Sequence, residues 1–509
     1  MTNTYSKYLA LIFICSFSTI AKAQDSLSLY SSIENQLDVF RILNNDFYRN
    51  PANMPGYSNN SFSNIRLNHQ NANKANYLLQ EGKAYSETNL QVSSYRAKKQ
   101  NITLWGDAAY TSIKTKNVQW NNNIDLERIN PIVIADSIGG TMNLQTYNFA
   151  GGFAKNIKKF SFGTELRYQA SLNYKTRDPR PKNTTSDLNI TLGTAYNLGE
   201  NYKIGIAAGI NRYVQTTTIA FSSEVQRTAL YQMNGMGTYN FYFSNKSENA
   251  VFTDFNHNYL LTFGSRDNLF NVTAGMLMGS LSKEIFFSES NPLYETNRID
   301  MNKSFAGISK IFKIKSNYKI GGKINFSKTE KKGTDIFYTN NTEIVTKLLE
   351  KENYGFTLNQ LDLNLIFEYK KENFSIYLQP FLATTKATES RYDIKANQNF
   401  NYNFTGFKLF YLQQINSKNL VSLNATFYQR TLQNIPDRLV LTQHLGINEW
   451  LVNDYNVKKT DYKVIETALR YDTKLLAKQS VYAIFALDYQ AFKNDNNNIQ
   501  TTLSLGITF

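Results

Sequence analysis

Apolar and polar side chains alternate along most of this chain, from residue 62 to its last residue. In the segment 318–327, one face carries Tyr318, Ile320, Ile324 and Phe326, and the other carries Lys319, Lys323, Asn325 and Ser327. A period of two residues is typical of a β-strand whose two faces meet different environments. The pattern therefore predicts strands that are apolar on one side and wet on the other.

Eighteen such segments can be placed, and the connections between them are unequal. Eight gaps are tight and polar, and most of the others are long, among them 113–144, 215–252, 330–357 and 431–461. Strict alternation of short and long connections is typical of up-and-down transmembrane barrels, with short periplasmic turns and long extracellular loops. The predicted strands cover residues 62–70, 84–96, 100–112, 145–155, 159–171, 186–197, 201–214, 253–264, 268–281, 302–314, 318–329, 358–370, 374–386, 402–414, 419–430, 462–474, 479–491 and 499–509.

This pattern predicts an all-β fold, a transmembrane antiparallel up-and-down β-barrel over residues 62–509 with about 18 strands, between about 14 and 20. Seven of the eight prolines lie outside the predicted strands. This is expected in a barrel, because each strand residue donates its backbone N–H to a neighbouring strand and proline has none. Pro380 is the exception. It predicts either a bulge in the segment 374–386 or a misplaced strand.

Composition excludes two other classes of protein. The chain has 509 residues, 34 Tyr and 34 Phe, and a mean hydropathy of −0.43. After residue 23 no stretch approaches the roughly 20 apolar residues that a membrane-spanning helix requires. The abundance of aromatic residues and the small net charge per residue exclude a disordered chain.

The first 23 residues resemble a secretory signal peptide. Lys7 precedes an apolar run from Tyr8 to Ile20, and Ala21-Lys22-Ala23 forms a small-x-small cleavage site. Cys15 is the only cysteine and lies inside that run, so the mature chain of residues 24–509 would contain no thiol. An exported protein without disulfides must be held by its own packing or by a membrane.

The last strand carries a resemblance as well as a pattern. Leu503, Leu505 and Ile507 alternate with polar or small residues, and the chain ends on Phe509. A terminal Phe on an amphipathic strand resembles the signal that the barrel-assembly machinery of the bacterial outer membrane reads. The whole mature chain resembles uncharacterised Gram-negative outer-membrane β-barrel families, known only as domains of unknown function. That resemblance implies a location in the cell outer membrane and a fold, but no activity.

Residues 24–61 precede the barrel and are predicted to lie in the periplasm or in the lumen. Ile33, Leu37, Phe40 and Phe47 recur at helix-like spacing, which predicts one short amphipathic helix over 26–43. Asn50-Pro51-Ala52 resembles an N-terminal element of the long-chain fatty acid transporter family, in which case these residues would form a hatch in the pore. The alternative is an ordinary turn, since Asn-Pro pairs commonly initiate turns.

The barrel size sets limits on the mechanism. About eighteen strands leave an aqueous lumen unless something fills it, and long polar loops could constrict it. The predicted lumen face carries charges of both signs, which are how pores select solutes. These are Glu165, Arg167, Lys323, Asp362 and Glu368. The segment before the first strand is too short for the plug domain of energised receptors, so active import is not expected.

Enzymatic and nucleic-acid functions find no support in the sequence. His69, His257 and His444 are far apart and have no metal-binding spacing, and phosphate-loop and dinucleotide motifs are lacking. We therefore predict no enzyme activity and no cofactor. The net charge of +15, or +13 without residues 1–23, comes from dispersed lysines that we assign to anionic lipid head groups or to solvation.

Three functional hypotheses remain. The first is a channel or porin-like transporter for small polar solutes. The second is a transporter of hydrophobic compounds of the fatty acid type, suggested by Asn50-Pro51-Ala52. The third is a surface-exposed binding or secretion-assembly partner, suggested by the long external loops. The solute and the oligomeric state are left open.

Overall fold

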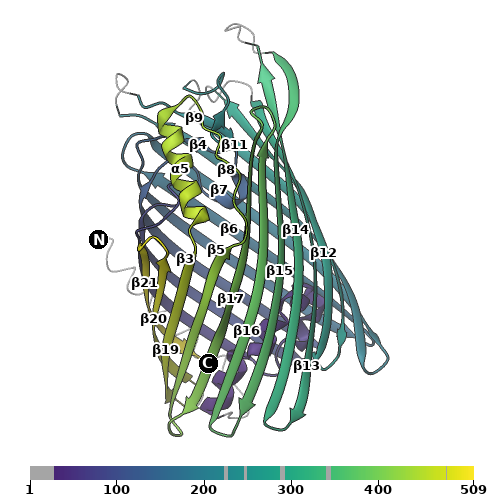
Figure 1. Cartoon of the computed structure of the whole chain (residues 1–509). Coiled ribbons are helices and arrows are strands. Elements are labelled where there is room, and N and C mark those ends of the chain that lie inside the picture. The colour runs from purple at the N-terminus through teal and green to yellow at the C-terminus, as the bar shows by residue number, and fades with distance from the viewer. Residues whose placement is uncertain (1–27, 223–226, 246–248, 287–292, 340–345, 477–478) are drawn as a thin grey trace, which may run out of the picture.

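The barrel predicted from the alternation is confirmed. The computed structural model describes residues 28–222, 227–245, 249–286, 293–339, 346–476 and 479–509, so the predicted signal peptide lies outside the described residues. Each strand of an 18-stranded sheet pairs antiparallel with its neighbour in the chain, and the last pairs with the first to close the barrel. Closure leaves no strand edge unpaired, which a membrane-spanning sheet requires (Figure 1).

The barrel strands match all eighteen predicted segments. They are β1 (Phe62–Lys74), β2 (Ala84–Lys99), β3 (Ile102–Val118), β5 (Gly140–Ile157), β6 (Phe160–Lys175), β7 (Arg180–Leu198), β8 (Tyr202–Ala220), β11 (Asn249–Ser265), β12 (Phe270–Phe286), β13 (Tyr294–Lys315), β14 (Tyr318–Tyr338), β15 (Lys347–Lys370), β16 (Phe374–Arg391), β17 (Ala396–Gln414), β18 (Asn419–Leu432), β19 (Tyr462–Leu476), β20 (Gln479–Phe492) and β21 (Asn497–Thr508).

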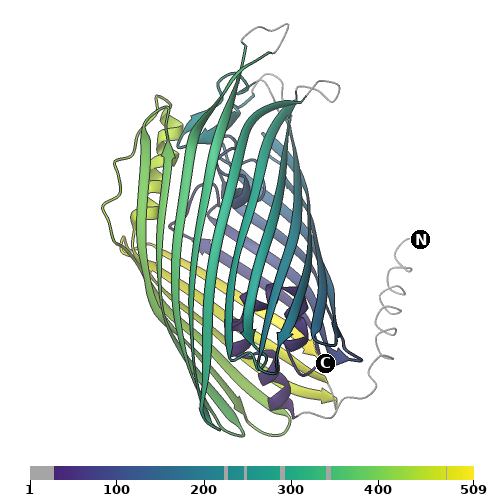
Figure 2. The ribbon, with the colours of Figure 1, turned by 90° about the vertical axis from the view of Figure 1, so that its right-hand side faces the viewer.

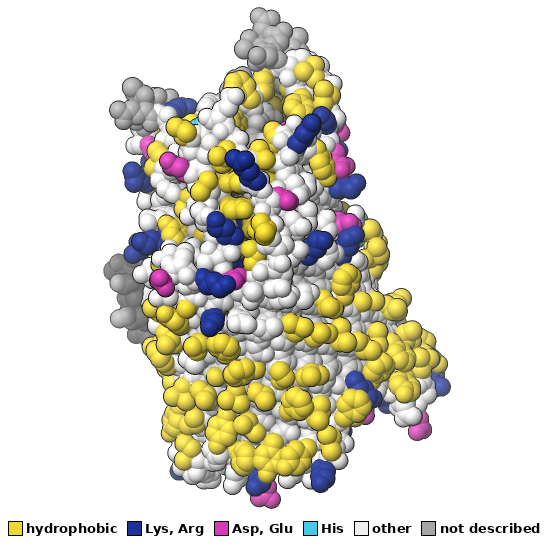
Figure 3. Space-filling view, viewed as in Figure 1, with side chains coloured by type: hydrophobic (Ala, Val, Ile, Leu, Met, Phe, Trp, Pro, Cys, Tyr) yellow, Lys and Arg dark blue, Asp and Glu magenta, His cyan; other side chains and the backbone are white. Residues whose placement is uncertain are grey.

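The alternation separates an apolar outside from a polar inside. In β21, Leu503 and Leu505 are each 54% exposed on the outer wall, whereas Ser504 between them is 4% exposed. On the face that Figure 3 shows, hydrophobic side chains cover the half near the short turns, and charged side chains are scattered over the other half. The band near the short turns is the part of the wall that suits a bilayer.

Several strands are longer than predicted at the long-loop end. β14 and β15 form one hairpin that continues to Tyr338 and begins again at Lys347, so most of the predicted loop 330–357 is strand. Beyond the apolar band, β14 and β15 stay paired through their backbone hydrogen bonds. Because these bonds do not require an apolar face, the strands continue where the alternation has ended. At the short-turn end, the turn predicted at 97–99 lies instead at Gln100 and Asn101, whose φ angles of 52° and 66° suit a two-residue hairpin.

Neither alternative predicted at Pro380 is correct. β16 runs through this residue, and the register with β15 is the same before and after it, so there is no bulge. Instead the pairing with β15 is interrupted for two residues, at Gln379 and Pro380, while Pro380 keeps its place opposite Phe407 of β17. Proline has no N–H to donate, and the ladder tolerates the loss by a local gap.

The N-terminal segment, which we define as residues 29–56, lies at the short-turn end of the barrel (Figures 1 and 2). It consists of α2 (Leu29–Gln36), α3 (Val39–Leu43), and the 3₁₀ helices η2 (Asn45–Arg49) and η3 (Pro51–Gly56). The predicted single helix over 26–43 is therefore wrong. Asp38 interrupts it, because its carboxylate accepts hydrogen bonds from the backbone N–H groups of Phe40 and Arg41 and caps a second helix.

Three long connections fold together at the other end. The β3–β5 connection contains α4 (Leu126–Ile129) and β4 (Ile134–Ala135), the β8–β11 connection contains β9 (Tyr231–Gly235) and β10 (Thr238–Tyr239), and the β18–β19 connection contains α5 (Leu445–Lys459). β10, β9 and β4 form a second small sheet, and Trp120 stacks on Trp450 of α5. These connections share one buried apolar cluster with the barrel wall, which we call the loop core. No helix in the described part of the chain is long and apolar enough to cross a membrane.

Candidate functional site

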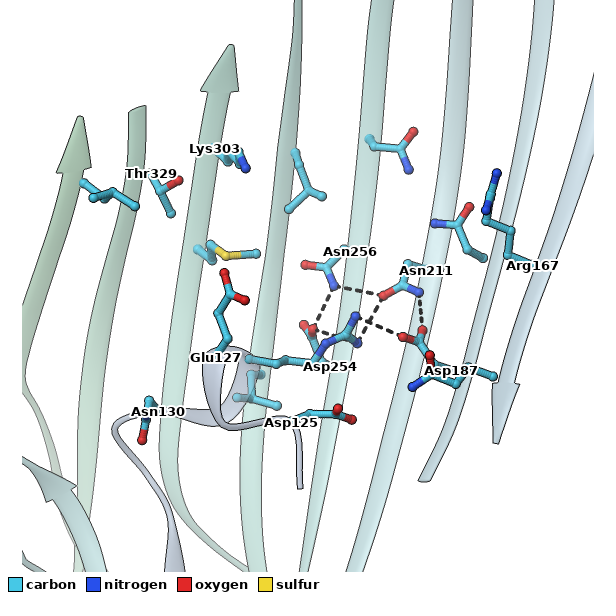
Figure 4. A pocket seen from close by; sticks show the side chains of 18 of the residues that line it. Asp125, Glu127, Asn130, Arg167, Asp187, Asn211, Asp254, Asn256, Lys303 and Thr329 are labelled. Carbon is cyan, nitrogen blue, oxygen red and sulfur yellow. Dashed lines mark hydrogen bonds and ion pairs between the residues drawn. The ribbon is translucent and has the colours of Figure 1, made fainter. Parts of the chain in front are cut away.

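A cavity of about 1780 Å³ lies inside the barrel. We call it the central chamber. Its lining includes Tyr48 and Arg49 of the N-terminal segment, Met233 and Trp450 of the loop core, and lumen-facing side chains of the strands between them. Figure 4 shows a part of this lining, where α4 meets the wall. The N-terminal segment and the loop core thus approach the same space from opposite ends of the barrel.

The N-terminal segment is fixed to the wall by buried amide side chains. Asn50 is fully buried, and its Nδ2 donates to the backbone oxygens of Thr194 and Ile206, each at 3.2 Å. Its Oδ1 accepts from the N–H of Ala52 at 3.0 Å, which begins η3. Asn53, also fully buried, donates to Thr262 Oγ1 at 3.2 Å. Each of these bonds satisfies a polar group that burial would otherwise penalise.

Charged and polar contacts hold the rest of the segment. Lys323 of β14 forms an ion pair with Asp46 at 2.6 Å, and Lys370 of β15 forms one with Glu34 at 2.5 Å. The Ser309 hydroxyl on β13 lies 2.6 Å from Asn44 Oδ1. These partners come from three neighbouring strands, so the segment is attached to one side of the barrel as well as at Asn50.

The loop core is attached to the wall through Arg128 of α4. Its Nη2 lies 3.1 Å from Asp187 Oδ2, and its Nη1 lies 3.4 Å from Asp254 Oδ2 (Figure 4). The guanidinium also lies 4.3 Å from the ring centroid of Tyr213. Burial raises the pKa of the nearby Asp125 carboxyl, and the Arg128 charge opposes that shift. The guanidinium thus ties a loop helix to β7, β8 and β11.

The chamber lining is strongly charged. It contains eight carboxylates, on Asp107, Asp125, Glu127, Glu165, Asp187, Asp254, Glu389 and Asp454, and six cations, on Arg49, Arg128, Arg167, Lys303, Lys331 and Lys458. Apolar and aromatic side chains, such as Met233, Phe305 and Trp450, lie between these charges. Fourteen ionisable groups would be costly to desolvate around an apolar ligand, which favours water and polar solutes next to them.

Five side chains were predicted to face the lumen, and the structure puts them in two places. Glu165 and Arg167 of β6 line the chamber and form an ion pair at 2.6 Å, and Trp105 Nε1 donates to Glu165 at 2.8 Å. The others lie on β14 and β15. Lys323 pairs with Asp46 as described, Glu368 is 4% exposed and pairs with Lys319 at 2.8 Å, and Asp362 is half-buried.

The other predicted residues are also placed. Asn50, Pro51 and Ala52 are buried against the inner wall, although their role as a hatch stays a prediction. Phe509 is 45% exposed, and its N–H donates to the Ser63 oxygen of β1 at 2.9 Å. The histidines lie apart in the barrel: His69 is on β1, His257 is on β11, and His444 begins α5.

The sequence did not reveal the residues that join the two inner assemblies to the wall. Asp46, Arg49 and Arg128 lie in segments without strand periodicity, so nothing in the pattern assigns them a face. Asp187 and Asp254 could have been found, because they occupy lumen-facing positions of strands near 186–197 and 253–264.

We predict that a methyl group at Gly163 displaces the N-terminal segment. A Cβ at this position of β6 would lie 2.4 Å from the carbonyl carbon of Pro51 and 2.6 Å from the nitrogen of Ala52. Both are backbone atoms, so Gly163→Ala should cost about 1–3 kcal/mol of contact with the segment. Hydrogen exchange of residues 44–57 in the purified, folded protein should become faster.

Gly151→Ala is the matched control, because a Cβ there meets nothing closer than 3.9 Å. Equal exchange in the two variants would show that η3 does not pack on β6 in solution.

The chain is remotely similar in structure to several solved outer-membrane proteins. The ferric yersiniabactin uptake receptor FyuA from Yersinia pestis is 8% identical, with 87% of this chain and 80% of that chain covered and a TM-score of 0.41. The siderophore receptor PiuA from Acinetobacter baumannii is 10% identical, with 87% and 82% covered and a TM-score of 0.40. A bacterial polysaccharide outer-membrane secretin is 9% identical, with 88% and 97% covered and a TM-score of 0.36. Similarity at this level carries no information about the ligand.

No curated protein sequence matches the chain significantly. Neither the similar structures named above nor the family match supports the predicted resemblance to fatty acid transporters. The closed barrel with its apolar outer band identifies an outer-membrane β-barrel protein. The model of the family of unknown function DUF6850 matches residues 51–509, which is most of the chain. The chain therefore belongs to the DUF6850 family.

Proposed function

We propose that the protein is an outer-membrane channel for small polar solutes in which the N-terminal segment acts as a hatch. The observation that carries this proposal is the charged central chamber, whose lining includes residues of both the N-terminal segment and the loop core. In this proposal, a solute that crosses the barrel passes the N-terminal segment and the loop core in turn. Charged groups of both signs offer such a solute hydrogen bonds and ion pairs in place of its hydration shell.

The hatch contacts support a segment that can move. Besides apolar packing of α2 and α3, and of the buried Phe47, Ala52 and Met54 in η2 and η3, the segment is joined to the wall by individual hydrogen bonds and ion pairs. Examples are the contacts of Asn44 with Ser309 and of Asp46 with Lys323. The net value of a single bond of this kind is about 0.5–1.5 kcal/mol, because water can replace it. A limited number of such bonds can be exchanged for water when the segment moves.

Permeation into vesicles tests the proposal. Liposomes containing the full chain should swell in an isotonic solution of a small neutral sugar faster than protein-free liposomes, and they should show no added uptake of laurate. Laurate uptake without swelling would instead support the hydrophobic-compound transporter. The charged groups of the lining argue against that outcome, because they would have to be desolvated wherever an apolar chain lies against them.

The surface-partner hypothesis has a separate observation in its favour. Phe241 and Ile435 are 84% and 94% exposed on the connections at the long-loop end, and Leu445 at the start of α5 is 79% exposed. Exposed apolar side chains of this kind are found at protein-binding surfaces. Liposomes that show neither swelling nor laurate uptake would leave this function as the better account.

A further inference from the structure

Four of the six cations that line the central chamber, Arg49, Lys303, Lys331 and Lys458, form no ion pair within 4.0 Å with a described residue. Two of these four, Arg49 and Lys303, meet at β13. Arg49 belongs to η2 of the N-terminal segment, and Lys303 belongs to β13 of the wall; both line the chamber and both are exposed to it. Among the residues that the structure describes, neither forms an ion pair within 4.0 Å or a side-chain hydrogen bond. Two other chamber cations have acidic partners: Arg128 pairs with Asp187, and Arg167 pairs with Glu165. Of the remaining two, Lys331 donates to the backbone oxygen of Glu127 at 2.9 Å, and Lys458 lies 6.0 Å from the ring centroid of Phe400.

Both cations are neighbours of Phe305, Arg49 through its ring and Lys303 along the strand. The Arg49 guanidinium carbon lies 4.5 Å from the ring centroid of Phe305. Lys303 precedes Phe305 by two residues on β13, so both side chains project from the same face of the strand and start roughly 7 Å apart. Two like charges held in one region raise the energy of the empty site, which an anion between them would relieve.

The chemistry of the donors selects the kind of anion. A guanidinium that stacks on an aromatic face keeps its N–H edge free, and that edge suits two oxygens of a carboxylate or phosphate. Lys303 adds a point charge. Thr329 of β14 lies directly opposite Lys303 in the ladder, lines the chamber beside it, and offers a hydroxyl donor (Figure 4).

We propose that Arg49, Lys303 and Thr329 form a binding site for an oxyanion, either a carboxylate or a phosphate group, between the N-terminal segment and the wall. The inference rests on the proposed function in one respect, since the anion would be part of a solute that enters the chamber. Because Arg49 comes from the segment and Lys303 from β13, the bound anion links the two. Binding of the anion would therefore stabilise the closed arrangement.

Calorimetric titration tests the site on the full chain, folded in detergent micelles, at constant ionic strength. Sodium phosphate and sodium acetate are the two probes, and the tighter of them identifies the group that the site prefers. Arg49→Gln and Lys303→Gln should each weaken binding about tenfold or more, since each removes a charge-assisted contact. Heat-dependent gel mobility of each variant verifies that the barrel has folded.

Lys408→Gln is the matched control. The Lys408 ammonium also lies near an aromatic ring, 5.7 Å from the centroid of Phe381, but this residue is on β17 and outside the described chamber lining. Binding in this variant should stay within about twofold of the wild type. The inference is overturned if neither probe binds, or if Arg49→Gln and Lys303→Gln bind as Lys408→Gln does.

The result is distinguishable from that of the swelling experiment. Swelling without anion binding would contradict the proposed anion site and support the proposed channel. Anion binding without swelling would support the proposed anion site and contradict the proposed channel.

Discussion

Replacement of Lys175 with methionine is expected to detach the β3–β5 connection from the barrel wall. Lys175 Nζ at the end of β6 lies 3.0 Å from Asp136 Oδ2 and 3.3 Å from Asn122 Oδ1. The side chains of Lys175 and Asp136 are each only 1% exposed. Removal of the cation leaves a buried carboxylate without its counter-charge, which typically costs about 3–5 kcal/mol. The connection can reduce this cost by moving Asp136 into water.

Movement of Asp136 would disturb the whole loop core. Asp136 immediately follows β4, whose backbone pairs with β9, and the backbone N–H of Trp120 donates to the backbone carbonyl oxygen of Asp136 at 2.8 Å. Hydrogen exchange of residues 119–139 should therefore become faster by two or more orders of magnitude, as expected for a loss of about 3 kcal/mol. The measurement is mass spectrometry on the protein folded in micelles.

The control variant removes a solvent-exposed ion pair on the neighbouring strand. Arg180 Nε of β7 lies 2.8 Å from Asp178 Oδ1, with side chains that are 38% and 29% exposed. Arg180→Met should cost no more than about 1 kcal/mol, because exposed pairs contribute little. If Lys175→Met exchanges no faster than Arg180→Met over residues 119–139, the buried pair does not hold the loop core.

The barrel could be predicted from the sequence because its two environments are repeated at every strand. Leu361, Leu363 and Leu365 alternate with polar residues along β15, and any shift by one residue would expose the polar set to lipid. Where the wall leaves the apolar band, this constraint ends. The polar stretch from Lys347 to Glu352 pairs as strand in the structure, although its composition gave no sign of it.

The inner assemblies could not be predicted in the same way. Asn44, Arg49 and Arg128 lie in segments whose positions depend on contacts with strands more than fifty residues away. Such contacts leave no periodic trace in a single sequence. The resemblance of Asn50-Pro51-Ala52 to a hatch element predicted that these residues lie in the pore. The same three residues are equally typical of an ordinary turn, so the sequence did not distinguish the two.

Pro380 shows the opposite case, in which a local rule was applied too strictly. A proline inside a barrel strand predicted a bulge or a misplaced strand, and the structure has neither. The side chain of Gln379 spans the gap, since its Nε2 donates to Asn364 Oδ1 at 2.9 Å. A single lost backbone bond is small compared with the pairing that flanks it on both sides.

A disulfide between the N-terminal segment and β13 should hold the hatch closed. Asn44 and Ser309 are 4% and 5% exposed, and the Ser309 hydroxyl lies 2.6 Å from Asn44 Oδ1. Cysteines at these two positions would therefore place their sulfur atoms close together. The only natural cysteine is Cys15, in the predicted signal peptide, so no thiol of the described residues competes. Once oxidised, Asn44→Cys/Ser309→Cys cannot release the segment from the wall.

A second cysteine pair is the control for effects of the cysteine substitutions and of oxidation themselves. Ser63 and Ser94 lie on β1 and β2 with their hydroxyl oxygens 2.8 Å apart. The variant Ser63→Cys/Ser94→Cys would join two strands that are already paired, without involving the N-terminal segment.

Single-channel conductance in planar bilayers, recorded before and after addition of dithiothreitol, tests the central claim that solutes pass when residues 29–56 move. The oxidised Asn44→Cys/Ser309→Cys protein should show the baseline current of a protein-free bilayer. Reduction should restore the wild-type conductance, and the Ser63→Cys/Ser94→Cys protein should conduct like the wild type in both states. If the oxidised Asn44→Cys/Ser309→Cys protein conducts as the wild type does, the N-terminal segment is not the hatch.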